Sequence, residues 1–144
     1  METVLIEKLR EYIIQNNPDI LINLQTDFSV TQYLEEKVQS IQPLLNELLT
    51  EGKPTYIIEE LCLNELTKDL RPSKFNFIRS VLEEEFERDF LLMKKMNTLT
   101  YEIMNIISEG ESMFEIFGFT EETEGNRDLR YAVAGTIQQF LESR

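Results

Sequence analysis

Apolar residues recur every three or four positions along most of the chain, which is the spacing that one face of an α-helix requires. The pattern predicts about six helices, which cover residues 4–15, 29–52, 55–70, 73–89, 92–110 and 126–141. Residues 20–24 form a short apolar run that fits either one helical turn or extended chain. No segment alternates apolar and polar residues between turn signals, as a half-buried strand would. The sequence therefore predicts an all-α fold with negligible strand.

Three of these predicted helices begin with polar residues that can cap a helix N-terminus. Ser29 and Gln32 have the spacing of a capping box, and Phe28 and Tyr33 occupy the two positions of a hydrophobic staple. Two later helices each have a single candidate cap, Ser73 and Asn126. We expect the three helices to begin at these residues.

Proline and glycine predict where helices end. Pro18 ends the first helix, because the residue before a proline avoids helical angles. Gly52 supplies a C-terminal stop for the second helix. Pro43 lies inside that helix, where a proline costs about 3 kcal/mol or more, so we expect a kink or a break near residues 39–43.

Three phenylalanines surround Gly118. Residues 112–117 are typical of a short helical turn that Gly118 closes in a left-handed conformation, after which Phe119 would fold back on Phe114. We favour cap and core packing as the role of Phe114, Phe117 and Phe119. The alternative is an exposed aromatic docking site for a partner.

The composition indicates one compact domain that spans residues 1–144. Apolar residues make up 42% of the chain, which is enough for a packed core, and five glycines and four prolines are scattered without forming a linker. Leu61 and Ile103 lie within apolar stripes and are expected in the core. Gly135, inside the last helix, is expected to allow close approach of a neighbouring helix.

A net charge of −13 limits the partners of the molecule. The chain has 14 Lys and Arg residues against 27 Asp and Glu residues, so its average surface repels phosphate backbones and anionic lipid headgroups. The first residues carry charges where a signal peptide would be apolar, and no apolar run approaches the ~20 residues of a membrane span. We therefore expect a cytoplasmic protein that binds neither nucleic acid nor membrane directly.

No histidine occurs in the sequence, which removes the side chain best suited to proton transfer near neutral pH. Nucleophiles that depend on histidine are excluded, together with ordinary zinc sites. The single Cys62 lies between Leu61 and Leu63, so we expect a buried structural thiol with a raised pKa. We predict no catalytic residue, no cofactor and no metal site.

Acidic residues gather in two segments. Residues 83–89 hold five carboxylates, but consecutive helix positions point about 100° apart, so we interpret them as a solvated helix face. Residues 96–126 contain no Lys or Arg and are uniformly negative, and they include a loop with Glu121, Glu122 and Glu124. This stretch can steer a basic protein or mimic a phosphate backbone, and the alternative is a solubilising surface.

Short motifs spread over most of the chain carry a family resemblance. They are Pro18-Asp19, Glu59-Glu60-Leu61 with Leu66 and Leu70, Ser73-Lys74, Val81-Leu82, Glu85-Phe86, Leu129, Gly135-Thr136-Ile137 and Phe140-Leu141-Glu142. In these positions the chain resembles a domain of unknown function, a family of small all-helical proteins found mainly in Bacteroidetes and often within or near conjugative elements. It departs from that family in having no Trp, with Glu83 and Phe140 where relatives often have one. The resemblance implies a helical fold and a bacterial cytosol, and it implies no activity.

The expected function is a non-enzymatic interaction or regulatory protein, accessory to a mobile element, that binds another protein through its acidic surface or an apolar groove. A basic protein is one candidate for that partner. The candidate contact residues are Glu121, Glu122, Glu124, Phe114, Phe117 and Phe119. The sequence leaves open whether the protein forms a homodimer. An acidic DNA mimic is the alternative, because carboxylates spaced along a ridge resemble phosphates. An enzyme that works with carboxylates and without histidine is the third hypothesis.

Overall fold

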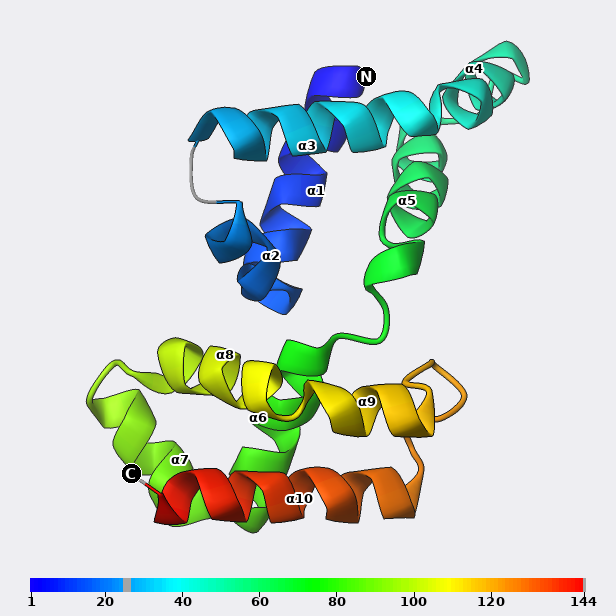
Figure 1. Ribbon diagram of the computed structural model, residues 1–144. Helices are drawn as coiled ribbons and strands as arrows, with labels where there is room; N and C mark the ends of the chain where they lie inside the picture. Colours follow the sequence, from blue (N-terminus) through cyan, green and yellow to red (C-terminus); the bar gives the residue numbers. More distant parts are fainter. Residues whose placement is uncertain (25–26, 144) are drawn as a thin grey trace. The chain divides into compact units, whose positions relative to one another are not determined.

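The computed structural model describes residues 1–24 and 27–143. Over these residues the chain forms ten α-helices, one short 3-10 helix and no strand (Figure 1). In chain order they are α1 (Glu2–Asn16), α2 (Pro18–Asn23), α3 (Asp27–Ser40), α4 (Gln42–Thr50), α5 (Thr55–Leu66), η1 (Lys68–Leu70), α6 (Lys74–Glu85), α7 (Glu87–Lys95), α8 (Leu99–Glu109), α9 (Glu111–Phe117) and α10 (Arg127–Glu142). The all-α prediction is confirmed, and the expected number of about six helices is wrong.

Pro43 separates α3 from α4. The two helices are divided at Ile41, which is buried, and Pro43 lies in the first turn of α4. In that turn a proline removes an N–H group that has no partner within the helix, so it costs little. The interruption predicted near residues 39–43 is therefore a break.

A second break, at Phe86, divides the helix expected over residues 73–89. Phe86 has a φ of −133° and a ψ of 49°, which are not helical angles. Its N–H donates to the Leu82 carbonyl at the end of α6, and its own carbonyl accepts the Phe90 N–H at the start of α7. No Gly or Pro stands at this position, so the sequence pattern carries no signal of the break.

The helix expected over residues 92–110 begins later, at Leu99, because Asn97 closes α7. Asn97 has a left-handed backbone with a φ of 58°. The following Thr98 N–H donates to the Met93 carbonyl (2.9 Å), as in a Schellman motif. Asparagine accepts this conformation more readily than most residues, which explains why the helix stops here.

Hydrogen bonds confirm two of the predicted helix starts. The Ser73 hydroxyl accepts the N–H of Asn76 (3.0 Å) at the start of α6. The side-chain oxygen of Asn126 accepts the N–H groups of Asp128 (2.8 Å) and Leu129 (3.1 Å) at the start of α10. Each of these bonds satisfies a backbone donor that has no partner within its helix.

The predicted start at Ser29 is wrong, whereas the predicted stop at Gly52 is confirmed. The helix α3 begins at Asp27, so Ser29 lies in its first turn, and the Phe28 side chain is too exposed to form a staple. Gly52 has a φ of 71°, and the next N–H, from Lys53, donates to the Leu48 carbonyl (3.3 Å). The left-handed angle explains why glycine stands there.

The chain divides into two compact units, Met1–Arg71 and Pro72–Arg144, which we call the N-terminal and the C-terminal unit. The core of the N-terminal unit consists of Leu5, Leu9, Ile13, Leu34, Val38, Ile41, Leu45, Leu48, Ile58, Cys62, Leu66 and Leu70. The core of the C-terminal unit consists of Phe75, Phe77, Ile78, Val81, Leu82, Phe90, Met93, Ile103, Ile106, Phe114, Leu129, Val133, Ile137 and Phe140. The sequence predicts one domain, because no segment with the composition of a linker separates the residues of these two cores. The single domain stays a prediction.

One helix lies at the centre of the contacts in each unit. In the N-terminal unit α1 packs against α2, α3 and α5, with Leu5, Leu9 and Ile13 fully buried at a spacing of four residues. In the C-terminal unit α6 packs against α7, α8 and α10 (Figure 1). Burial of such a side chain contributes roughly 1.5–3 kcal/mol relative to leaving it exposed.

Of the two residues that the apolar pattern placed in the core, one is buried and the other is exposed. Ile103 is fully buried, as predicted, whereas the Leu61 side chain is 43% exposed, so its predicted burial is wrong. The buried side of α5 is formed by Ile58, Cys62 and Leu66. Leu61 is one position away from that stripe, which turns its side chain by about 100°.

The close helix contact expected at Gly135 is also wrong. A methyl group on Gly135 would meet no other atom within 4 Å. The tight position is Gly110, where a methyl carbon would lie 3.2 Å from the Ile106 carbonyl oxygen and 3.4 Å from the Thr136 methyl group. At Gly135, α10 faces open space and not a neighbouring helix.

We predict that Ile103→Ala lowers the free energy of unfolding by about 2–5 kcal/mol, because it leaves a cavity in a closed core. The matched change Leu61→Ala should cost no more than about 0.5 kcal/mol, since that side chain is exposed. Urea denaturation followed by circular dichroism measures both. Equal losses for the two variants would contradict the assigned burial.

We predict that Gly135→Ala stabilises the protein by about 0.5–1 kcal/mol, because alanine has the higher helix propensity and meets no obstacle there. Gly110→Ala is the control and should bring no gain, since its methyl group is crowded. Thermal unfolding of both variants beside the wild type gives the comparison. A loss of stability in Gly135→Ala would restore the close contact expected from the sequence.

Candidate functional site

The carboxylates singled out in the sequence lie together in an exposed turn between α9 and α10: Glu121, Glu122 and Glu124. We call residues 118–126 the acidic turn. Thr123 holds its backbone, because the Thr123 hydroxyl donates to the Gly118 carbonyl (2.7 Å) and accepts the Thr120 N–H (2.7 Å). The turn therefore presents its carboxylates from a fixed backbone.

Hydrogen bonds keep one of these carboxylates in its charged form. A bond from its own backbone N–H lowers the pKa of the Glu122 carboxyl below the ordinary value, and a bond from the Thr120 hydroxyl lowers it further. Since carboxyl groups of ordinary pKa are already ionised at neutral pH, the shift extends the charge of the turn toward acidic pH.

The expectation of a uniformly negative surface over residues 96–126 is too simple. Glu102 is buried in the first turn of α8, where the positive end of the helix dipole favours a carboxylate. Glu111 lies 3.9 Å from the ammonium group of Lys74, on α6. The exposed acidic surface of this stretch is therefore smaller than its composition suggests.

The acidic segment over residues 83–89 contributes to a contact between two helices. Arg130 of α10 approaches Glu84 at 2.6 Å and Glu85 at 3.9 Å, both on α6. The interpretation as a purely solvated face therefore needs correction for these two residues. Exposed ion pairs contribute little, in general about 0–1 kcal/mol, so this contact adds little to stability.

The three phenylalanines around Gly118 pack as the cap interpretation predicts. Phe114 is only 2% exposed, and its ring centroid lies 4.8 Å from that of Phe119. Phe77 of α6 completes the group, 5.9 Å from Phe114 and 5.3 Å from Phe119. Gly118 has a φ of 63°, and Phe117 is half-buried. Phe114 is therefore not on the surface, and partner contact by Phe117 and Phe119 stays a prediction.

Sequence reasoning missed Ile116, which is 72% exposed on α9. The buried or half-buried positions of this helix are Met113, Phe114 and Phe117, which share one side at helical spacing. Ile116 falls on the other side, and Glu115 beside it is exposed as well. The helical spacing around Phe114 was the signal in the sequence that could have predicted the exposure of Ile116.

Cys62 is fully buried in the core of the N-terminal unit, as predicted, and burial raises the pKa of its thiol. A thiol in that state is a poor nucleophile. Over the described part of the chain, no three Cys, Asp or Glu side chains come together in a way that could hold a metal ion. Residues 1–24 and 27–143 contain no helix long and apolar enough to cross a membrane.

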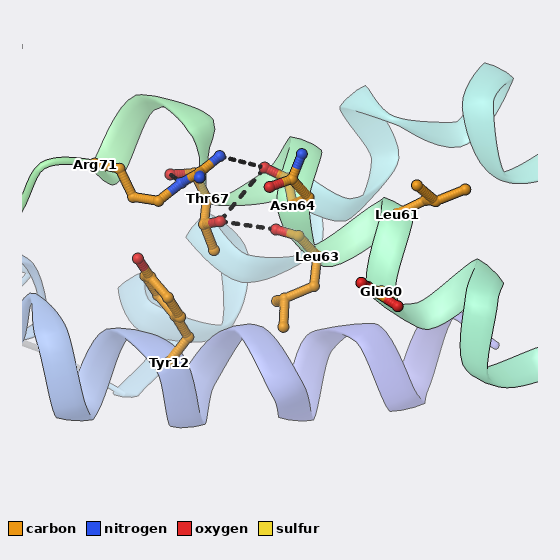
Figure 2. Close-up of a pocket in the computed structure, with 7 residues that line it drawn as sticks. All are labelled: Tyr12, Glu60, Leu61, Leu63, Asn64, Thr67 and Arg71. Carbon is orange, nitrogen blue, oxygen red and sulfur yellow. Dashed lines mark hydrogen bonds between the residues drawn. The ribbon is translucent and has the colours of Figure 1, made fainter. Parts of the chain in front are cut away.

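The N-terminal unit has an open cleft of about 510 Å³ that the sequence analysis did not anticipate. Its lining combines polar and apolar side chains from α1, α5 and the end of the unit: Tyr12, Glu60, Leu61, Leu63, Asn64, Thr67 and Arg71. In Figure 2, Arg71 and Tyr12 lie toward one end of the cleft, and Glu60 and Leu61 lie toward the other. Volumes of 300–1,000 Å³ are usual for ligand sites.

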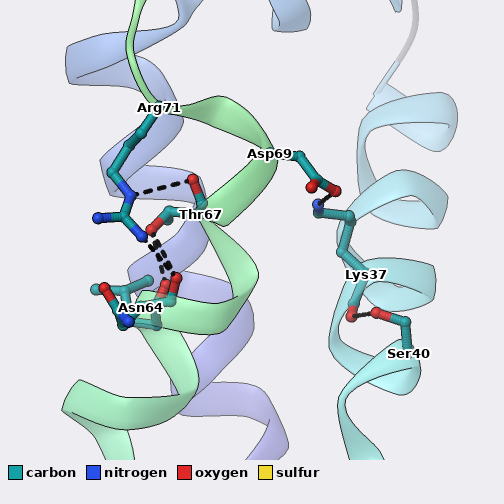
Figure 3. Close-up of polar contacts among 7 residues, drawn as sticks. Lys37, Ser40, Asn64, Thr67, Asp69 and Arg71 are labelled. Atoms are coloured by element: carbon teal, nitrogen blue, oxygen red, sulfur yellow. Dashed lines mark hydrogen bonds and ion pairs between the residues drawn. The ribbon is translucent and has the colours of Figure 1, made fainter. Parts of the chain in front are cut away.

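Backbone carbonyls hold the guanidinium of Arg71 in place. Its Nε donates to the Thr67 carbonyl (3.4 Å) and its Nη2 to the Asn64 carbonyl (3.2 Å), both at the C-terminal end of α5 (Figure 3). The Thr67 hydroxyl donates to the Leu63 carbonyl (2.9 Å). The Leu63 and Thr67 carbonyls also accept backbone N–H groups, from Thr67 (3.0 Å) and Leu70 (2.9 Å). The side-chain bonds therefore add to the backbone bonds at the end of α5 and fix a positive charge at one end of the cleft.

Two other charged residues of this region are paired with neighbouring helices. Asp69 lies 3.6 Å from Lys37 of α3 (Figure 3), and Glu59 lies 3.5 Å from Lys8 of α1. Glu60 is exposed and forms an ion pair with none of the described residues. The cleft therefore has a negative charge at its other end.

We predict that the stability of the protein falls as the pH rises above about 8.5, the ordinary pKa of a cysteine. The pKa of Cys62 is higher in the folded state than in the unfolded state, so the thiol contributes to the free energy of unfolding. This contribution is fully present below the unfolded pKa and is lost as the pH rises through the folded pKa. Urea denaturation between neutral and alkaline pH measures the effect. In Cys62→Ala the fall should be smaller, and an identical pH dependence in both proteins would contradict the burial of the thiol.

Comparison with protein-family models, with curated proteins and with solved structures finds no match to this chain.

Proposed function

We propose that this chain is a non-enzymatic protein-binding protein whose C-terminal unit binds a basic partner through the acidic turn and Ile116. The observation that carries the proposal is the exposure of Ile116, next in sequence to the exposed Glu115 and just before the exposed carboxylates of the acidic turn. Protein interfaces commonly place an apolar anchor at the centre and polar groups around it. The side chain of Ile116 is such an anchor, and Glu115 with the carboxylates of the acidic turn provides the rim.

The fixed backbone of the acidic turn supports the same proposal. Because Thr123 already holds the turn, binding would not have to order it, and less conformational entropy would be lost. A chain with a net charge of −13 attracts a basic partner over distances of a Debye length, about 8 Å at physiological ionic strength. A second copy of this chain would meet like charges at the turn, which favours a different protein as the partner.

The other hypotheses receive less support. A phosphate-like ridge would need exposed, regularly spaced carboxylates, whereas Glu102 is buried and Glu84 and Glu111 lie beside cations. An enzyme would need polar groups that converge on a reactive centre, and the open cleft brings together no nucleophile and base. In the setting that the family resemblance implies, the protein would be an accessory factor of a mobile element.

The test captures binding proteins from the source cell and measures their association with the purified chain at low and at physiological ionic strength. We expect association to slow as salt rises, and expect reversal of Glu121, Glu122 and Glu124 to Lys to slow it more than it speeds dissociation. Ile116→Ser should instead speed dissociation, because it removes the apolar anchor.

The matched control reverses Glu7, Glu11 and Glu35, which are exposed carboxylates of the N-terminal unit, and changes the net charge by the same amount. It should retain most of the association rate if the acidic turn is the contact surface. A partner whose binding responds equally to both triple reversals, or to neither, would show that the acidic turn only keeps the protein soluble.

A further inference from the structure

We propose that the outward face of α7 is a second protein-binding surface of the C-terminal unit, and that it binds an amphipathic helix whose apolar stripe has acidic residues at both ends. We call this surface the α7 face, and it consists of Arg88, Leu91, Leu92, Lys95 and Met96. In Figure 1, α7 lies at one end of the C-terminal unit, and the acidic turn, between α9 and α10, lies at the other. The two surfaces therefore bind partners of opposite charge without overlapping.

Three large apolar side chains of the α7 face are more than half exposed. The exposed fractions are 54% for Leu91, 53% for Leu92 and 62% for Met96. The buried side of the same helix is formed by Phe90 and Met93, so α7 is anchored in the core without these three side chains. An exposed apolar cluster with charged residues around it is typical of a protein contact.

Helix geometry joins these side chains into one surface that suits another helix. Residues three or four positions apart are neighbours on a helix. Arg88, Leu92 and Met96 form one row at this spacing, and Leu91 and Lys95 form a second row beside it. Helices pack by placing such rows into the grooves between the rows of a partner. An extended segment would instead need a sheet edge or a groove.

The charges of the α7 face select an acidic partner. Arg88 lies near the start of the helix and Lys95 at its end, with Leu91 and Leu92 between them. Both cations are exposed, and neither forms an ion pair with any residue in the ranges 1–24 and 27–143. Residues 87–96 hold three cations against two anions, a net charge of +1, in a chain whose net charge is −13. Acidic residues at both ends of a partner's apolar stripe complement this arrangement and fix its position.

A small hollow beside Leu92 and Met96 offers a place for the end of an apolar side chain of the partner. Its volume is about 70 Å³, which exceeds the roughly 10–15 Å³ that a single water needs. It is lined by Asp89, Leu92, Met93, Met96 and Thr98. Because Asp89 is one of these residues, the hollow favours an apolar group over an acidic one, and the acidic residues of the partner pair with Arg88 and Lys95.

The position of the two cations disfavours a second copy and a lipid surface as the occupant. At about 100° per residue, Arg88 and Lys95 lie in the middle of the face, between Leu91 on one side and Leu92 on the other. Two copies that paired through this face in antiparallel would place Arg88 of one beside Lys95 of the other, and like charges repel. Helices that lie in a membrane surface keep their cations on the polar side, whereas insertion of this face would bury both charges.

A phage-displayed library of helical peptides of about 16 residues tests the α7 face, with the full-length chain as the binding protein. Each peptide keeps an apolar stripe, and the positions at the two ends of the stripe are randomised. We expect enrichment of Asp and Glu at both ends. The selection is made at physiological ionic strength, where charges more than about 8 Å away are largely screened, so remote carboxylates of the chain do not mask the preference.

Lys95→Glu should lower the affinity for the selected peptides about fivefold, because it replaces an exposed attraction with a repulsion. It should also change the preference at one end of the stripe from acidic to basic and leave the other end acidic. The matched control is Lys68→Glu, which makes the same charge change at an exposed position of η1. It should leave the selection unchanged.

Leu92→Ser should lower the affinity for the same peptides about tenfold, because it removes apolar surface from the middle of the contact. Leu49→Ser is its control, since Leu49 is 50% exposed on α4, which has nine residues as α7 has. It should leave the affinity unchanged. All four variants should keep the circular dichroism of the wild type, because each position is exposed.

Two results of the selection would overturn the α7 face: no enrichment of acidic residues, or equal effects of Leu92→Ser and Leu49→Ser. Sedimentation of the purified chain and its binding to vesicles of anionic phospholipid are measured beside it. Self-association or vesicle binding that Leu92→Ser abolishes would also overturn the proposal, because the face would then belong to a second copy or to a membrane. None of these outcomes affects the acidic turn, whose partner is basic.

Discussion

The backbone groups at the ends of short helices are the constraint on which this structure depends. Even the longest helix in the described part of the chain, α10, has only 16 residues, and half of the ten α-helices have fewer than 12. Isolated helices shorter than about 12–15 residues are only marginally stable. Each end leaves up to four donors or acceptors without a partner in the helix. Side chains such as Ser73, Asn126 and Arg71 satisfy some of them, and the left-handed residues Asn97 and Gly118 satisfy others by turning the chain back. The two cores can form because the helices that line them are ended in this way.

The sequence predicts those helix ends that a special residue type produces. Pro43, Gly52 and Gly118 have backbone preferences strong enough to act in any context, and each ends or interrupts a helix where it was expected to. The break at Phe86 has no such residue. It arises from packing, since Phe86 itself is partly buried against the core of the C-terminal unit, and a pattern of apolar positions contains no information on where a continuous stripe changes direction.

The candidate sites were predictable to different degrees for the same reason. The acidic turn and the aromatic packing around Gly118 are local in sequence, so composition and spacing reveal them. The cleft of the N-terminal unit joins Tyr12 with residues about 50 positions later, and no local pattern connects these segments. Leu61 shows the same limit on one helix, because an apolar residue beside the buried stripe looks like part of it until the neighbouring helices are placed.

Arg71 also connects the cleft with the motions of the chain. Its backbone is extended, with a φ of −109° and a ψ of 137°, and the proline that follows prevents the helix from continuing. Because its guanidinium holds the carbonyls of Asn64 and Thr67, the last turn of α5 cannot unwind without breaking these bonds. Fraying of residues 64–70 therefore requires release of the guanidinium. The hydrogen exchange of amides in that segment would report how long the arginine stays in position, and any molecule that holds the arginine would slow it.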